Sequence, residues 1–139
     1  MAPEIILKKN ERVVLHLLRE IFKVRTDFGT KILWKDFSQK VIETKEFKIS
    51  SEQDLKATLE KFKAYNLIAY SIYDPSAHME VRASDKYTAI IYPPDRSRMV
   101  LKALVTYIGD SYLETSKLSF KLRRLIPKVT KYLLGKILP

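Results

Sequence analysis

The chain has 139 residues and a formal net charge of +10. Its length suits one domain, or two small ones sharing a core, and its 46% of apolar residues excludes wholesale disorder. It contains no cysteine, which excludes disulfides, cysteine nucleophiles and thiolate metal sites. No apolar run approaches the roughly 20 residues that span a bilayer, and the N-terminus lacks the order of a signal peptide, so we expect a cytoplasmic protein.

Three amphipathic helices are expected in the first half of the chain, because apolar residues recur there at helical spacing. The third has the clearest start, since Ser50 or Ser51 can cap the free N–H groups of its first turn, and Asn66 is its expected C-terminal stop. Trp34, the only tryptophan, is expected in the core. The expected helices cover residues 10–24, 33–43 and 51–65.

The periodicity then changes to about two residues, which predicts antiparallel strands rich in isoleucine and tyrosine. Turns are expected at residues 74–77 and 84–86, and Pro93-Pro94-Asp95 is expected to be a short, stiff linker. The expected strands cover residues 67–73, 78–83 and 87–92.

Three more helices are expected after the linker, over residues 97–108, 116–125 and 127–138. Pro127 is expected to separate the last two, because proline fixes its own φ and disfavours the α region at Ile126. Proline also suits the first turn of the helix that follows.

The positive charge is concentrated in the last third of the chain. Residues 1–95 hold 16 basic and 14 acidic side chains, whereas residues 96–139 hold 10 basic and 2 acidic ones. A polyanion is the expected partner of such a segment. Nucleic acid is favoured over a membrane surface, because interfacial membrane helices present a larger apolar face than these helices have.

The order helix, helix, helix, hairpin over residues 10–92 resembles the winged-helix superfamily. The resemblance is carried by the apolar stripe of the first helix, by SSEQDLKATLEKFKAYNLI, and by LIAYSIYD leading into MEVRAS. The motif L-x-x-x-L-x-x-F-x-x-x-x-L-I looks like the recognition helix and first wing strand of many such domains; it is formed by Leu55, Leu59, Phe62, Leu67 and Ile68. The resemblance implies a mainly α fold with a small antiparallel β-hairpin or meander.

Residues 97–138 resemble the three-helix core of a helix-turn-helix domain without a wing. We therefore expect a winged-helix domain at residues 1–95, and a basic helix-turn-helix-like unit at residues 96–139 that packs on it or follows it. Tandem arrangements of this kind also occur in protein-scaffolding members of the superfamily. A protein-interaction adaptor within a larger nucleoprotein or other assembly is therefore the alternative function.

The basic C-terminal unit is the expected nucleic-acid-binding surface, since exposed cations on two successive helices can straddle a phosphate backbone. The third helix of the first unit is electrically neutral, with Glu52 and Asp54 at the end that would meet phosphates, and is expected to act as scaffold. The wing can add two cations. The residues expected to contact double-stranded DNA are Lys117, Lys121, Arg123, Arg124, Lys128, Thr130, Lys131, Lys136, Arg82 and Lys86.

An excess of lysine over arginine, with no Asn or Gln on the last helix, favours backbone contacts and low sequence specificity. The expected function is a DNA-binding transcription regulator or a chromatin- or replication-associated factor, located with the nucleoid. A homodimer or a protein partner is also compatible with this function. The simpler alternative to DNA binding is that the two basic C-terminal helices only pack on the rest of the protein. Scarce Asn and Gln resemble the composition of proteins from heat-loving organisms and suggest a thermophilic archaeon or its virus as the source.

No enzymatic activity, cofactor or metal is expected. The three glycines are too scattered for a phosphate-binding loop, and there is no Gly-x-Ser-x-Gly, His-x-x-x-His or cluster of acids at metal spacing. Of the two histidines, His16 is expected to be structural and His78 to be solvated. An adaptor would use the tyrosine-rich sheet, with Tyr65, Tyr70, Tyr73, Tyr87 and Tyr92.

Overall fold

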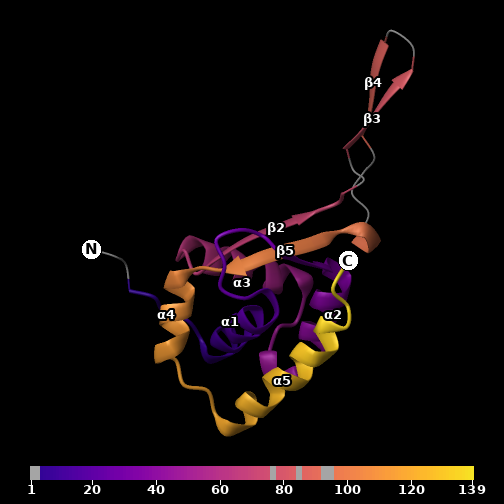
Figure 1. Ribbon diagram of the computed structural model, residues 1–139. Coiled ribbons are helices and arrows are strands. Elements are labelled where there is room, and N and C mark those ends of the chain that lie inside the picture. Colours follow the sequence, from indigo (N-terminus) through magenta and orange to yellow (C-terminus); the bar gives the residue numbers. More distant parts are fainter. Residues whose placement is uncertain (1–3, 76–77, 84–85, 92–95) are drawn as a thin grey trace.

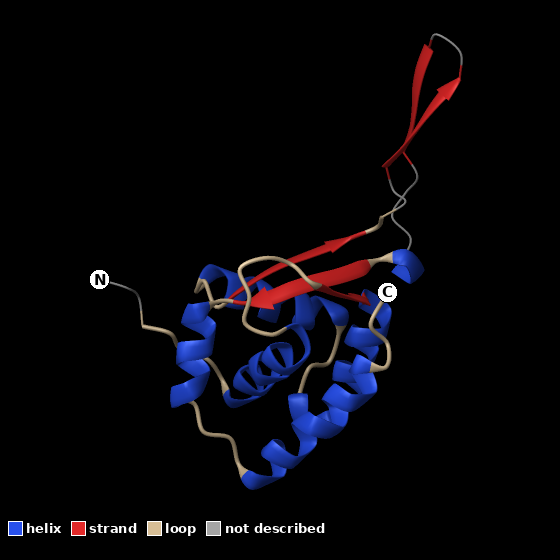
Figure 2. Ribbon diagram, in the orientation of Figure 1, coloured by secondary structure: helices blue, strands red, loops and turns tan. Residues whose placement is uncertain are grey.

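The computed structural model describes residues 4–75, 78–83, 86–91 and 96–139, with the backbone alone for the strands between residues 78 and 91. The fold is mixed and mainly helical, with a small antiparallel sheet (Figures 1 and 2). The helices are α1 (Lys9–Phe22), α2 (Trp34–Glu43), α3 (Glu52–Ala64), α4 (Tyr107–Thr115) and α5 (Phe120–Leu134), with 3₁₀ turns η1 (Lys45–Phe47) and η2 (Arg96–Arg98). The strands are β1 (Thr30–Leu33), β2 (Ile68–Tyr73), β3 (His78–Ala83), β4 (Lys86–Ile91) and β5 (Val100–Val105).

Three strands form one antiparallel sheet in the order β1-β5-β2. The central strand, β5, is the last of the three in sequence, and its Leu101 pairs with Ile32 of β1 and Ile72 of β2. The short strand β1 was not expected from the sequence. It lies between the first two helices and ends where α2 begins.

Helix α1 lies at the centre of the helical layer, beneath the sheet and between α4 and α5 (Figure 1). Its buried stripe packs against β5, α5 and α4, and eight of its fourteen residues are buried. Trp34 is also buried in this core, as predicted, with Phe37 beside it at 6.2 Å between ring centroids. Burial of this apolar surface is the main force that holds the layers together.

Helix α3 begins and ends at the residues that the sequence indicates. The Ser51 hydroxyl accepts a hydrogen bond from the Asp54 N–H at 3.1 Å, which caps the first turn. Asn66, beyond the last turn, has a φ of 60°, in the left-handed region that asparagine tolerates better than most residues. The predicted start and stop signals of this helix are therefore confirmed.

The predicted helix over residues 97–108 is wrong, because the chain there forms η2 and then β5. Five of the six residues of β5 are buried, so side chains on both faces of this central strand are covered. A strand buried on both sides is a continuous apolar run, and periodicity alone cannot distinguish it from a buried helix. Gly109, just beyond the predicted helix, lies in the first turn of α4, where a Cβ would approach the Leu67 carbonyl oxygen to 2.2 Å.

The predicted break at Pro127 is also wrong, because α5 continues through it as one helix. Proline removes one backbone hydrogen bond, and in a helix interior this costs about 3 kcal/mol. The loss is offset by an apolar stripe that packs on α1 and α2 on both sides of the proline. This stripe consists of Leu122, Ile126, Val129 and Leu133.

The final third of the chain therefore does not form a three-helix unit. It supplies the central strand, α4 and α5, and residues of β5, α4 and α5 belong to the same hydrophobic core as those of α1, α2 and α3. The segment after α1 is hydrogen-bonded to the end of β5: Arg25 N–H donates to the Val105 carbonyl and Val105 N–H to the Lys23 carbonyl.

Strands β3 and β4 form a separate two-stranded hairpin between β2 and β5, and it projects away from the helical body (Figures 1 and 2). The predicted strands at residues 67–73 and 78–83 correspond to β2 and β3, and the third predicted strand corresponds to β4, one residue earlier. The linker Pro93-Pro94-Asp95, Tyr92 and parts of both predicted turns lie outside the described residues.

Candidate nucleic-acid interface

One face of α5 carries a row of exposed cations. Lys121, Arg124, Lys128 and Lys131 are three, four and three residues apart, a spacing that places them on one side of a helix. The buried stripe occupies the opposite side, where it contacts α1 and α2. The continuity of the helix through Pro127 is what aligns the two halves of this row, which we call the α5 basic face.

Although Glu46 lines a hollow together with Lys121, Arg124 and Lys128, no carboxylate forms an ion pair with the α5 basic face in the part of the chain that the structure describes. The ion pairs found there involve Arg19, Lys40, Lys61, Arg96 and Arg98, and none involves a cation of α5. The sequence has no acidic residue after Glu114 that could approach from the same segment. The Arg124 guanidinium lies 5.6 Å from the Phe120 ring centroid, so it is supported by an aromatic side chain and keeps its charge available.

The length of the α5 basic face matches the repeat of a phosphate backbone. From Lys121 to Lys131 the helix rises by about 15 Å, at ~1.5 Å per residue. One strand of B-DNA presents a phosphate about every 3.4 Å along the duplex axis, so about four phosphates occupy that distance. Four cations over this length therefore have roughly the linear charge density needed to follow one strand.

The positive surface continues beyond the first turn of α5. A hollow of about 430 Å³ lies where the N-terminal ends of α1 and α5 meet η1, and Lys121 is one of its lining residues. Lys9, Lys45 and Lys48 also line it, with Glu46 as the single carboxylate among the described lining residues. The cations of two further elements thus adjoin the α5 basic face at its N-terminal end.

Several predicted contact residues lie elsewhere. Thr130 faces the core with 8% of its surface exposed, so it cannot contact DNA as expected. Lys128 and Lys131 were expected in the first turns of a helix but lie past its middle, because α5 begins at Phe120. Lys117 lies in the segment before α5 and was expected on a helix. Lys136 is exposed beyond the end of α5, with its Nζ 5.6 Å from the Tyr132 ring centroid.

The wing cations are separated from α5. Arg82 lies on β3, opposite Tyr87, and Lys86 begins β4, opposite Ala83. Their hairpin projects from the sheet end of the molecule, away from α5 (Figure 1). The structure therefore does not bring Arg82 and Lys86 together with the α5 cations.

Helix α3 differs from α5 because its charged side chains are engaged within the molecule. Glu52 accepts hydrogen bonds from Arg96 and from Ser38, and the bond from Arg96 is the main reason that the pKa of Glu52 is lowered. Lys61 Nζ lies 2.9 Å from the largely buried Glu11 carboxylate, and the Tyr70 hydroxyl donates to Glu60. The acidic N-terminal end of α3 is thus held by neighbouring cations and hydroxyls.

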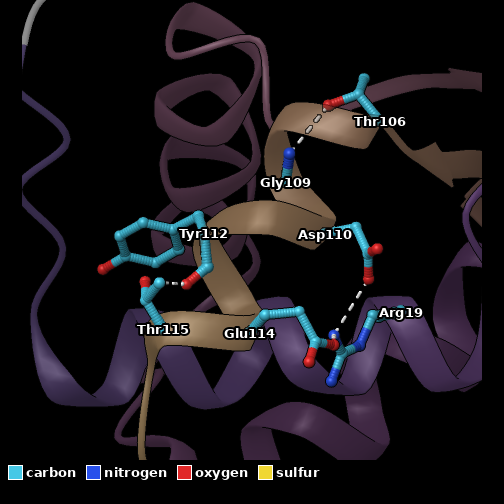
Figure 3. Close-up of polar contacts among 7 residues, drawn as sticks. All are labelled: Arg19, Thr106, Gly109, Asp110, Tyr112, Glu114 and Thr115. Atoms are coloured by element: carbon cyan, nitrogen blue, oxygen red, sulfur yellow. Dashed lines mark hydrogen bonds and ion pairs between the residues drawn. The ribbon is translucent and has the colours of Figure 1, made fainter.

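A second group of polar residues was not singled out from the sequence. His16 and Arg19 lie one turn apart on α1 and border a cleft that also includes Arg123. Arg19 Nη1 bonds to Asp110 at 3.1 Å and to Glu114 at 2.8 Å, which joins α1 to α4 (Figure 3). Burial, and then the charge of Arg19, lower the pKa of His16 to about 4. The i, i+3 spacing of His16 and Arg19 was the signal available in the sequence.

Helix α4 is anchored at its start by a threonine. The Thr106 hydroxyl accepts from the Gly109 N–H at 3.0 Å (Figure 3) and donates to the carbonyl of Asn66 at 2.6 Å. These bonds fix α4 to the α3–β2 junction and set the position from which Asp110 and Glu114 reach Arg19. Arg19 is therefore neutralised, while Arg123 across the cleft is not.

Comparison with protein-family models, with curated proteins and with solved structures found no match for the chain. Within the described residues, no group of three His, Asp or Glu side chains is close enough to hold a metal ion. None of the helices described has both the length and the apolar character required to cross a bilayer.

Proposed function

We propose that this protein is a winged-helix DNA-binding protein that contacts the phosphate backbone through the α5 basic face. The fold part of the proposal rests on the order of elements. The helices α1, α2 and α3, with β1 between the first two, precede the last two strands of the antiparallel sheet, and a projecting hairpin connects those two strands, in the position of a wing. A fold does not determine function, so the side chains exposed on it identify the binding surface.

The observation that carries the binding proposal is the row of unpaired cations on one helix. Four exposed cations without carboxylate partners create a local positive potential that neutral or paired surfaces lack. Contacts of this kind release counterions from DNA and give affinity with little base discrimination. A role as a transcription regulator or as a chromatin- or replication-associated factor on the nucleoid follows from such binding.

The test is binding of a fluorescent duplex DNA across a salt series, measured by anisotropy. Four phosphate contacts predict a slope of about −3.6 for log K against log salt concentration, since each contact contributes roughly −0.9. A slope near zero, or no binding at low salt, contradicts the proposal. A duplex RNA of the same length, measured in parallel, separates DNA binding from general affinity for helical polyanions.

A second candidate function, protein–protein interaction, is favoured by the exposed surface of α4. Tyr107 is 72% exposed and Ile108 51% exposed, and both line a shallow depression with Ile5 and Tyr112. Exposed aromatic and aliphatic side chains of this kind are enriched at interfaces. Light scattering of Ile108→Glu against the unchanged protein tests this candidate, because loss of a dimer in the variant supports it and a monomer in both opposes self-association.

A further inference from the structure

A large cleft lies between α1, the segment before α5, and α5 itself. Its volume is about 880 Å³, within the range of small-molecule sites. Its lining combines apolar side chains, which include Leu118 and Ile126, with the cations of Lys117 and Arg123. A molecule with an apolar body and a polar end suits such a lining.

Unpartnered polar atoms are concentrated around this cleft. Four buried side-chain nitrogen or oxygen atoms among the described residues have no hydrogen-bond partner, and three of them belong to residues that line it. These three are His16 Nε2, Ser116 Oγ and Thr130 Oγ1, and Thr130 as a whole is more than nine-tenths buried. A buried polar atom without a partner is costly, so three around one cleft require an explanation.

The electrostatics of the cleft favour an anion. Arg19 is neutralised by Asp110 and Glu114, but Lys117, Arg123 and Lys131 have no carboxylate partner among the described residues. Glu20 is the single carboxylate among the lining residues. The uncompensated charge around the cleft is therefore positive.

We propose that this cleft binds a small organic anion, with its acidic group at Arg123 and Lys117 and its apolar body against Leu118 and Ile126. In this proposal the acidic group also engages the unpartnered hydroxyls of Ser116 and Thr130, and His16 lines the same cleft. Charge-assisted hydrogen bonds of this type are about twice as strong as neutral ones. The site shares Lys131 with the α5 basic face, but its other α5 residues lie on a different side of the helix from Lys121, Arg124 and Lys128.

The probe for this site is naphthalene-1-carboxylate, with the neutral naphthalene-1-carboxamide as its matched control. The two histidine side chains can be followed by NMR, and His16→Gln assigns the signals. Burial, and then the charges of Arg19 and Arg12, lower the pKa of His16 to about 4. We expect the carboxylate to shift the His16 signal saturably and to raise this pKa, because a bound anion opposes the effect of the two arginine charges. Glu114, which already raises that pKa, is unchanged by the probe.

Two adjacent arginines provide the matched variants. Arg123→Gln should weaken carboxylate binding about tenfold or more, because it removes a charged hydrogen-bond donor. Arg124→Gln, which removes the same charge from the next residue on the α5 basic face, should leave the affinity within about twofold. Thr130→Val, which keeps the shape of the side chain, should weaken binding and leave the fold intact.

Three results would overturn the proposal. The first is the absence of any saturable response of His16 to the carboxylate. The second is equal binding of the carboxylate and the carboxamide, which would remove the role of charge. The third is an equal effect of Arg123→Gln and Arg124→Gln, which would show a general response to net charge. Loss of DNA binding has no bearing on any of these outcomes.

Discussion

Helices α3 and α5 are similar in length but differ in how their charges are used. On α3 the acidic side chains Glu52 and Glu60 bond to Arg96 and Tyr70, and Lys61 pairs with Glu11. On α5 the cations of the basic face have no acidic partner in the described structure. The number of cations on a helix is therefore a poor guide to polyanion binding. A better guide is whether other side chains already neutralise those cations.

The largest expected effect tests whether α5 belongs to the core as fully as α3 does. Leu133 of α5 and Leu59 of α3 are both 0% exposed, so replacing either by alanine leaves a cavity. Each variant should lose about 2–5 kcal/mol of unfolding free energy. Chemical denaturation followed by circular dichroism measures both. A separate, early transition for Leu133→Ala alone would show that α5 unfolds independently.

The next largest effect is on duplex DNA affinity, and it distinguishes α5 from α3 as the binding surface. Lys128→Glu with Lys131→Glu should weaken duplex binding about 100-fold, because two attractive charges become repulsive. The matched pair on α3, Lys56→Glu with Lys63→Glu, should change it only a few-fold, since these lysines lie on a different helix from the α5 basic face. Anisotropy at low salt measures both pairs. The reverse ranking would move the interface to α3.

A smaller effect on stability is expected at Pro127. This proline lies inside α5, whereas α3 contains no proline. Pro127→Ala restores a backbone N–H that can donate to the Arg123 carbonyl and removes the steric conflict of proline in a helix. We expect stability to rise by about 2 kcal/mol, somewhat less than the full ~3 kcal/mol difference in helix propensity. Thermal unfolding measures this. A fall in stability would mean that the proline ring makes necessary contacts along the cleft.

The smallest effect is the pH dependence that Glu52 gives to α3. Because the pKa of Glu52 is lowered in the folded state, chiefly by its hydrogen bond with Arg96, its stabilisation is present above the ordinary value of 4.5. It is lost as the pH falls through the lowered pKa. Glu52→Gln should therefore flatten the decline in melting temperature on acidification. An unchanged acid profile would assign that decline to other carboxylates.

The sequence was sufficient to predict those helices and strands in which local signals and packing agree. The stripes of α1 and α2, the cap at Ser51 and the stop at Asn66 predicted these helices, and alternation predicted β2 and β3. β5 was missed because both of its faces are covered, so no alternation remains in its sequence. β1, with only four residues between two helices, is too short to show a period.

The candidate site was predictable only in part, for a related reason. The cations of α5 were identified from composition, but their common face depends on a helix that continues through Pro127 against the local preference of proline. The same misplaced break placed Thr130 in the exposed first turn of a predicted helix. In the continuous helix α5, Thr130 faces the core instead. The cleft of His16 and Arg123 combines distant segments, so only the tertiary structure brings it together.

The late position of β5 in the chain has a consequence for synthesis. β1 and β2 both pair with a strand that ends at Val105, so neither can complete its ladder until that residue has left the ribosome. Until then a nascent chain exposes two unpaired strand edges beside a partly formed helical layer, a state prone to aggregation. A fragment cut before residue 100 should remain in this state, however well its three helices form.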